Sequence, residues 1–135
     1  MHQRAIYAFL AVLFAACIAL PAKSMAWGAV ATGEKGTDAA IAASSSWESA
    51  AKAQSVALHD CRTNRLAGSA CHLVKTFQNQ CVGVALGYAG KQRTAKYSWA
   101  LAPNRGSAQQ QALSKCRAAG NSQCQPRAKF NACDP

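Results

Sequence analysis

The chain has 135 residues, half of them hydrophobic, and carries 15 lysines and arginines against five acidic residues, a formal net charge of +10. This length suits one compact domain and leaves too little chain for two of ordinary size. The excess of positive charge favours anionic partners.

The first 26 residues have the pattern of a secretory signal peptide. A basic start at Arg4 precedes an apolar run over residues 5–20, and Ser24-Met25-Ala26 supplies the small residues that a signal peptidase recognises. The run is shorter than the roughly 20 residues that a membrane span needs. We therefore expect cleavage before Trp27 and a mature domain of residues 27–135, with an uncleaved anchor as the alternative.

Cys17 raises a second alternative. Residues 14–17 resemble a lipobox, which would make Cys17 a lipidated first residue, but Phe14 is unusual in that motif and apolar residues follow the cysteine. We therefore expect a periplasmic or secreted protein without integral membrane association. Its mature part has 13 basic and five acidic residues, a net charge of +8, and six cysteines. An even number of cysteines in a small exported domain is typical of disulfides.

The first half of the mature chain, residues 27–81, predicts two strands, a helix and a third strand. These elements are expected at residues 27–31, 39–43, 45–62 and 71–81. Ser45 and Glu48 fit a capping box at the start of the helix. The apolar stripe of that helix is expected to comprise Trp47, Ala50, Ala51, Leu58 and Cys61, interrupted by Gln54.

The second half, residues 82–135, predicts the same series again. Strands are expected at residues 82–88, 97–101 and 124–133, with a helix after the second that Asn104 caps and Gly120 ends. One face of the first strand consists of Gly83, Ala85 and Gly87, which indicates close approach of another element. Pro126 favours an edge position for the last strand.

The expected fold is therefore α+β: two strand-strand-helix-strand repeats forming one largely antiparallel sheet of roughly six strands, with two helices packed on it. The repeat is also visible in the cysteines, because each half reads Ala-Leu-x-x-Cys, a short loop, Cys, five residues, Phe, two or three residues, Cys. Duplicated units of this kind usually stack or pair to bury a shared core.

Six cysteines allow 15 pairings, and the repeat narrows them. A cysteine at a helix end is followed by one at a strand start in both halves, which favours Cys61–Cys71 and Cys116–Cys124. The equivalent cysteines that remain would then form Cys81–Cys133. The main alternative bonds Cys61 to Cys81.

No catalytic or metal-binding constellation is evident. The mature chain has five acidic residues, Glu34, Asp38, Glu48, Asp60 and Asp134. Glu34 and Asp38 could serve as paired carboxylates only if a glycine-rich turn held them face to face. His59 and His72 with the cysteines could suggest a metal site, but no Cys-x-x-Cys pair is present. We expect no metal, no cofactor and no catalytic residue.

Basic residues gather at three places: after the end of the first helix, at the hairpin beside two aromatic residues, and near the end of the second helix. The candidate residues for binding an anion or a partner are Arg62, Arg65, Lys91, Arg93, Lys96, Tyr97, Trp99, Arg127 and Lys129. Basic patches with aromatic residues can bind nucleic acid or sugars. The alternative is a cationic surface beside two core aromatics, and nucleic acid is not the expected partner.

Several of these segments resemble a known family. Residues 27–31, the helix that ends in Cys61, the segments 71–74 and 77–81, and the second helix with its Ala-Leu-x-x-Cys ending are similar to the bacterial "domain of unknown function 4189" family. The resemblance covers essentially all of the mature chain. It implies a small exported bacterial protein, and it provides no catalytic residue to transfer.

We therefore expect a small exported, disulfide-stabilised basic module that binds a protein or an anionic envelope polymer, such as an inhibitor or immunity-type protein. Two other functions stay open. One is a secreted effector acting on a host or a competing cell. The other is a cell-envelope hydrolase, which would need a concave site where Glu34 or Asp38 meets His72 or Asp60.

Overall fold

The computed structural model describes residues 26–63 and 70–134, so the expected signal peptide with Cys17 lies outside the described residues, as does Arg65. The elements in chain order are β1 (Trp27–Lys35), β2 (Asp38–Trp47), α2 (Ala50–Thr63), β3 (His72–Phe77), β4 (Gln80–Ala89), β5 (Thr94–Ala102), α3 (Arg105–Ala118), β6 (Ser122–Pro126), the 3-10 turn η2 (Ala128–Phe130) and β7 (Ala132–Asp134). This is the predicted α+β class with two helices. Within the described ranges, no helix is long and apolar enough to cross a membrane.

The strands form two antiparallel sheets in place of the single sheet expected. The N-terminal sheet has the order β2-β1-β3, and the C-terminal sheet has the order β5-β4-β6, with β7 also paired to β4. In each sheet the first strand is central, and the second strand and the strand after the helix flank it. The two halves thus share one topology, which is consistent with the repeat in the sequence.

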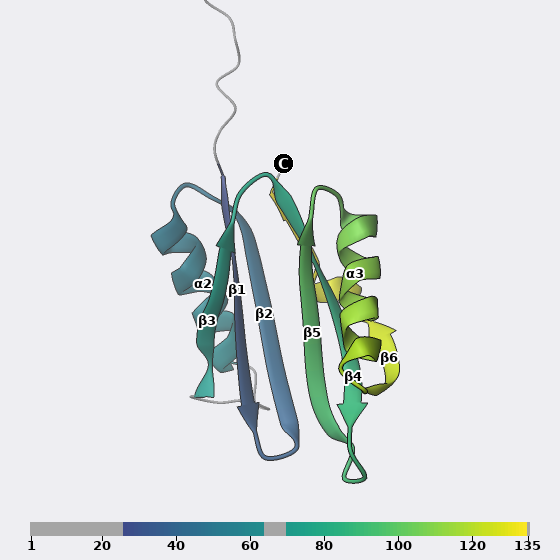
Figure 1. Ribbon diagram of the computed structural model, residues 1–135. Coiled ribbons are helices and arrows are strands. Elements are labelled where there is room, and N and C mark those ends of the chain that lie inside the picture. The colour runs from purple at the N-terminus through teal and green to yellow at the C-terminus, as the bar shows by residue number, and fades with distance from the viewer. Residues whose placement is uncertain (1–25, 64–69, 135) are drawn as a thin grey trace, which may run out of the picture.

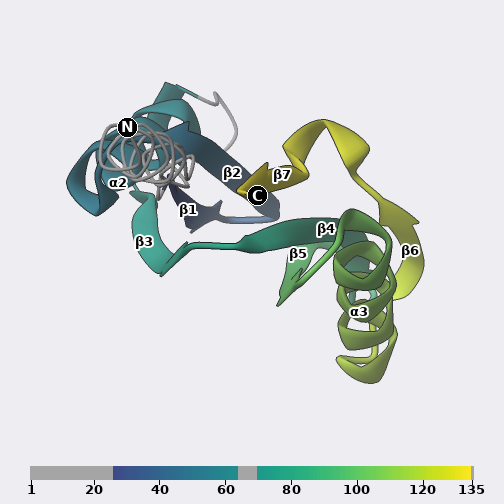
Figure 2. The same cartoon turned by 90° about the horizontal axis from the view of Figure 1, so that it is seen from above.

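The molecule is layered as helix, sheet, sheet, helix, with α2 against the N-terminal sheet and α3 against the C-terminal sheet (Figure 1). Seen from above, β7 lies beside β2, and the connection from β3 to β4 joins the two sheets (Figure 2). The core between the sheets consists of large apolar side chains, namely Val30, Ile41, Phe77, Val82 and Val84, with Tyr97, Trp99, Leu101 and Phe130 packed against them. The outer face of each sheet is also apolar, and a helix covers it, with Ala29 and Ala31 of β1 packed against α2 and Ala85 of β4 packed against α3.

Small residues let both helices lie close to their sheets. Ala53, Ala57 and Cys61 are fully buried on α2, and the equivalent positions of α3 are Ala108, Ala112 and Cys116. A Cβ at Gly83 would lie 2.3 Å from the backbone of Ala108. The small face predicted for β4 is therefore the face on which α3 packs.

Three disulfides cross-link the domain, and they join the pairs that the repeat favoured. Cys61–Cys71 and Cys116–Cys124 each tie the end of a helix to the strand that follows, across sequence separations of 10 and 8 residues. Cys81–Cys133 joins β4 to β7 across a separation of 52 residues. The Cys61–Cys81 alternative is not formed.

The start of α2 differs from the prediction. Pairing with β1 extends β2 as far as Trp47, so the segment with Ser45 is strand and not a helix cap. Ser49 takes the capping role, because its Oγ accepts a hydrogen bond from the Lys52 N–H at 3.2 Å. The buried stripe is also shifted. It runs through Ala53 and not through the predicted Ala51, because a helix so rich in alanine offers little contrast between its faces.

The single last strand predicted over 124–133 is broken in two. Past Pro126, the Arg127 N–H donates to the Val84 carbonyl at 2.8 Å, and the chain makes the turn η2 before pairing again as β7. The side chain of Asn131 replaces a strand partner, because its Oδ1 accepts from the Val84 N–H at 3.0 Å and its Nδ2 donates to Gln109 Oε1 at 2.8 Å. This departure from regular pairing places Arg127 and η2 beside the space between the sheets.

Candidate functional site

A cleft of about 440 Å³ opens at the end of the molecule where the β1–β2 and β4–β5 hairpins turn. We call it the cationic cleft. Its lining comes from the β1–β2 turn, β2, β4, the β4–β5 turn, β5 and the segment from Arg127 through η2. The lining residues are Thr37, Asp38, Ala39, Leu86, Tyr88, Gln92, Arg93, Ala95, Tyr97, Arg127, Lys129 and Phe130. A volume of this size is within the range of small-ligand sites.

Arg93 is held in place at the tip of the β4–β5 hairpin. Its backbone adopts a φ of 53°, and its N–H donates to the Gly90 carbonyl at 3.3 Å, which closes the turn. Its Nη2 donates to Gln123 Oε1 at 2.7 Å, and the guanidinium carbon lies 5.6 Å from the centre of the Tyr88 ring. Because these contacts fix the guanidinium before any ligand arrives, less side-chain entropy is lost on binding.

Arg127 and Lys129 enter the cleft from the segment that follows β6. The Nε of Arg127 is buried and has no hydrogen-bond partner within the described part of the chain. Lys129 Nζ lies 4.7 Å from the centre of the Phe130 ring. A buried donor without a partner is costly, so an acceptor that reached Arg127 would satisfy it.

Tyr97 forms a wall of the cleft from β5. Its ring meets Phe130 edge to face, with 6.0 Å between the ring centroids. Burial raises the pKa of the Tyr97 hydroxyl, the Arg127 charge opposes that shift, and Tyr88 adds to it. The hydroxyl is therefore protonated at neutral pH and can donate a hydrogen bond.

The charges around the cleft are unbalanced. Three basic side chains face a single acidic one, Asp38. Glu34, the other acidic residue of the β1–β2 hairpin, forms a salt bridge with Lys96 at 2.7 Å. Guanidinium and ammonium groups around one hollow suit a carboxylate or a phosphate, which arginine can bind through two parallel hydrogen bonds.

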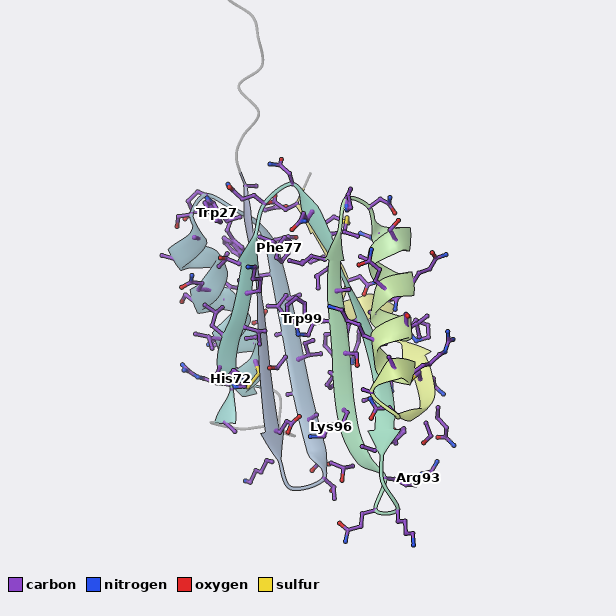
Figure 3. All side chains as sticks on the ribbon, viewed as in Figure 1. Trp27, His72, Phe77, Arg93, Lys96 and Trp99 are labelled. Atoms are coloured by element: carbon purple, nitrogen blue, oxygen red, sulfur yellow. A yellow bond between two sulfur atoms is a disulfide. The ribbon has the colours of Figure 1, made fainter. Side chains whose placement is uncertain are left out.

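A smaller hollow of about 170 Å³ lies beside the cleft, between the N-terminal sheet and β5. We call it the Trp99 groove. It is lined by Thr32, Gly33, Glu34, Ala39, Ala40, His72, Val74, Tyr97 and Trp99. Figure 3 shows Trp99 between β2 and β5, with Lys96 further along β5 and Arg93 at the hairpin beyond it. Ala39 and Tyr97 line both hollows.

The structure brings together four of the nine candidate residues named from the sequence, Arg93, Tyr97, Arg127 and Lys129, at the cationic cleft. Trp99 lies in the adjacent groove. The others lie elsewhere. Lys96 is paired with Glu34, Lys91 is exposed in the hairpin without lining the cleft, Arg62 is exposed in the last turn of α2, and Arg65 lies outside the described residues.

The sequence prediction did not include Tyr88, Phe130 and Asp38 among the site residues. Tyr88 shares the alternation of Val84 and Leu86, so its position on the inner face of β4 could have been inferred. Asp38 was considered only as a catalytic carboxylate, and Phe130 gave no signal of a place in a site. They reach the cleft because η2 interrupts the last strand and because the β1–β2 hairpin meets β5, where the Ala95 N–H donates to the Thr37 carbonyl at 2.8 Å.

The residues considered for catalysis or metal binding are mostly dispersed. His59 and Asp60 are exposed on α2, whereas Glu34 and His72 both line the Trp99 groove. The Glu34 carboxylate accepts a hydrogen bond from Lys96. Groups of three or more His, Cys, Asp or Glu side chains that could hold a metal ion do not occur in residues 26–63 and 70–134.

Comparison with known proteins identifies one family. Residues 27–131 match the family described as Domain of unknown function (DUF4189). Searches of curated proteins and of solved structures found no match.

Proposed function

Because the chain belongs to the family described as Domain of unknown function (DUF4189), whose description gives no activity, we propose from the cleft itself that this protein is an exported binding module for an anionic ligand. The observation that supports this most is the grouping of Arg93, Arg127 and Lys129 around one hollow with a single carboxylate. The ligand would be a partner protein or an envelope polymer that presents carboxylates or phosphates.

The disulfides support the export. All six cysteines of residues 27–135 are paired, and small domains with this many bridges are typical of oxidising compartments outside the cytosol. The bridges also tie each helix to the strand that follows it and tie β7 to β4. A site that is already formed binds with a smaller loss of conformational entropy.

Binding explains the cleft better than hydrolysis does. A glycosidase needs two carboxyl groups across the scissile bond, and the cationic cleft offers only Asp38. In the neighbouring groove, Glu34 is engaged by Lys96 at 2.7 Å. The secreted-effector alternative is compatible with the same cleft, since it concerns where the ligand is met and not how it is bound.

The test is binding of the exported protein, purified with its disulfides formed, to two anionic probes, polygalacturonate and polyglutamate. Arg127→Gln should weaken binding to at least one probe about tenfold, the effect of losing one charge-assisted hydrogen bond. Added salt should weaken wild-type binding, because it screens the cationic cleft.

The matched control is Arg62→Gln, which removes the same charge from the exposed end of α2. It should leave the affinity within about twofold, and neutral dextran should not bind. Equal losses in the two variants would mean that net charge alone attracts the probes, and the proposed site would then be wrong.

A further inference from the structure

The cationic cleft and the Trp99 groove meet at Tyr97, and we infer that together they bind one glycan strand, with an acidic sugar in the cleft and a neutral sugar in the groove. This inference rests on the proposed function and specifies its ligand. It commits to a glycan in which charged and uncharged units are neighbours.

The cationic cleft and the Trp99 groove adjoin. Both lie in the space between the sheets, and Ala39 and Tyr97 contribute to the lining of each. Ala39 is buried below them, and the half-buried ring of Tyr97 stands where they meet. A ligand longer than one unit that occupies the cleft would therefore pass Tyr97 and enter the groove.

The two hollows differ in charge. The cleft has three basic side chains and one acidic one. In the groove, the carboxylate of Glu34 forms a salt bridge with Lys96, and the lining includes no lysine, arginine or aspartate. The cleft thus suits an anionic unit, whereas the groove suits a unit that carries polar groups without net charge.

The lining of both hollows suits ligand rings that have polar edges, such as sugars. Aromatic side chains stand in both hollows, with Tyr88 and Phe130 in the cleft, Trp99 in the groove and Tyr97 between them. The C–H face of a sugar ring can pack on such rings, while hydroxyl groups reach Thr32 and His72. An acidic protein segment has no sugar rings to pack on these aromatic side chains. Protein partners are also usually bound by broader surfaces than these hollows offer.

Three probes test the inference: glucuronic acid, a tetrasaccharide of hyaluronan in which glucuronate alternates with an uncharged amino sugar, and polyglutamate. The tetrasaccharide should bind at least tenfold more tightly than glucuronic acid. His72→Ala should weaken only the tetrasaccharide, about threefold to tenfold, whereas Arg127→Gln should weaken both sugars. His59→Ala, at an exposed position on α2, is the matched control and should change neither.

A second readout follows Trp99 directly. In a Trp27→Phe/Trp47→Phe variant, Trp99 is the only tryptophan left. Its fluorescence should change when the tetrasaccharide binds and should stay constant with glucuronic acid. This measurement reports occupation of the groove without substituting any residue that lines it.

The outcomes separate the two claims. Two results would overturn the inference that a glycan strand binds and leave the anion site intact, provided that binding still depends on Arg127. One is equal affinity for the two sugars, and the other is unchanged Trp99 fluorescence on adding the tetrasaccharide. Tighter Arg127-dependent binding of polyglutamate than of the tetrasaccharide would overturn the choice of glycan in the same way. If Arg127→Gln weakened the binding of none of the three probes, the proposed function would be wrong as well.

Discussion

The two halves of the domain share one architecture and differ in charge. Residues 27–81 and 82–135 each place the first strand at the centre of a sheet, flanked by the second strand and the strand after the helix. The first half has five basic and four acidic residues, whereas the second has eight basic residues and one acidic residue, Asp134. Asp134 is buried, so every charged side chain on the described surface of the second half is basic.

This comparison separates the residues that stabilise the fold from the residues that form the candidate site. The positions that the halves have in common include small or sulfur-containing residues on the helices, such as Ala57 and Cys61 on α2 and Ala112 and Cys116 on α3, and these are fully buried. The basic residues of the second half lie on the β4–β5 hairpin, on α3 and in the last segment, and the three that line the cationic cleft come from the hairpin and the last segment. The second half also adds β7, for which the first half has no counterpart.

The largest effect is expected from the bridge that joins the two halves. Cys81–Cys133 closes a loop with a sequence separation of 52 residues, so Cys81→Ala/Cys133→Ala should lower the free energy of unfolding by about 4 kcal/mol in the chain-entropy model. Urea unfolding of the purified variant measures this. A loss below about 1 kcal/mol would mean that β7 is held in place by packing alone.

The two bridges inside the halves should behave alike. Cys61–Cys71 and Cys116–Cys124 span 10 and 8 residues, and removing either pair should cost about 2.5 kcal/mol. The measurement is the same urea unfolding, made on the two double-alanine variants side by side. Costs that differed by more than about 1.5 kcal/mol would show that the halves are not energetically equivalent.

Two glycines on the central strands should not behave alike, because they lie on different faces of their sheets. A Cβ at Gly83 would meet the backbone of Ala108 at 2.3 Å, whereas one at Gly28 would meet the ring of Phe77 at 2.2 Å. A ring can shift more readily than a helix backbone, so we expect Gly83→Ala to cost about 2 kcal/mol and Gly28→Ala about 1 kcal/mol. Thermal unfolding of both variants checks this order, and the reverse order would contradict the packing of α3 on β4.

The smallest effect concerns Asp134, which is specific to the second half. Burial raises the pKa of its carboxyl group, and its oxygens have no hydrogen-bond partner in the part of the chain described. The folded state therefore favours the protonated form. The resulting stability is complete below the pKa of the unfolded chain, about 4, and is lost as the pH rises through the folded pKa.

Asp134→Asn should remove this component, on the order of 1 kcal/mol, so that its stability falls less than that of the wild type between pH 4 and pH 7. Urea midpoints at the two pH values provide the measurement. Asp60→Asn, at an exposed position on α2, is the matched control. An unchanged pH dependence in Asp134→Asn would show that the carboxyl does not titrate differently in the folded state.

The repeat made much of the fold predictable. The spacing of the cysteines gave the three pairs, the alternation in β4 gave its small face, and Asn104 was recognised as the cap of α3, where its Oδ1 accepts from the Ser107 N–H at 2.8 Å. The division into two sheets could not be read in the same way. Alternating apolar residues show that a strand has a buried face, but they do not show whether a helix or a second sheet covers it.

The site was only half predictable for a related reason. Basic residues beside aromatic residues are visible in the sequence, but their grouping depends on η2, which breaks the expected last strand and directs Arg127 and Lys129 to the cleft. That break depends on Asn131, which hydrogen-bonds to Val84 from 47 residues away in the sequence. Contacts of this range leave no local pattern.

The most direct test is to locate the bound anion by the backbone amide NMR shifts of the disulfide-bonded protein during titration with polygalacturonate. We predict that the largest shifts occur at Arg93, Tyr97, Arg127 and Phe130, and that the amides of α3, which carries Arg105, Lys115 and Arg117 outside the cleft, stay nearly unchanged. Shifts of equal size on α3 and around the cleft would contradict this, because the charge of the second half would then attract anions without a defined site.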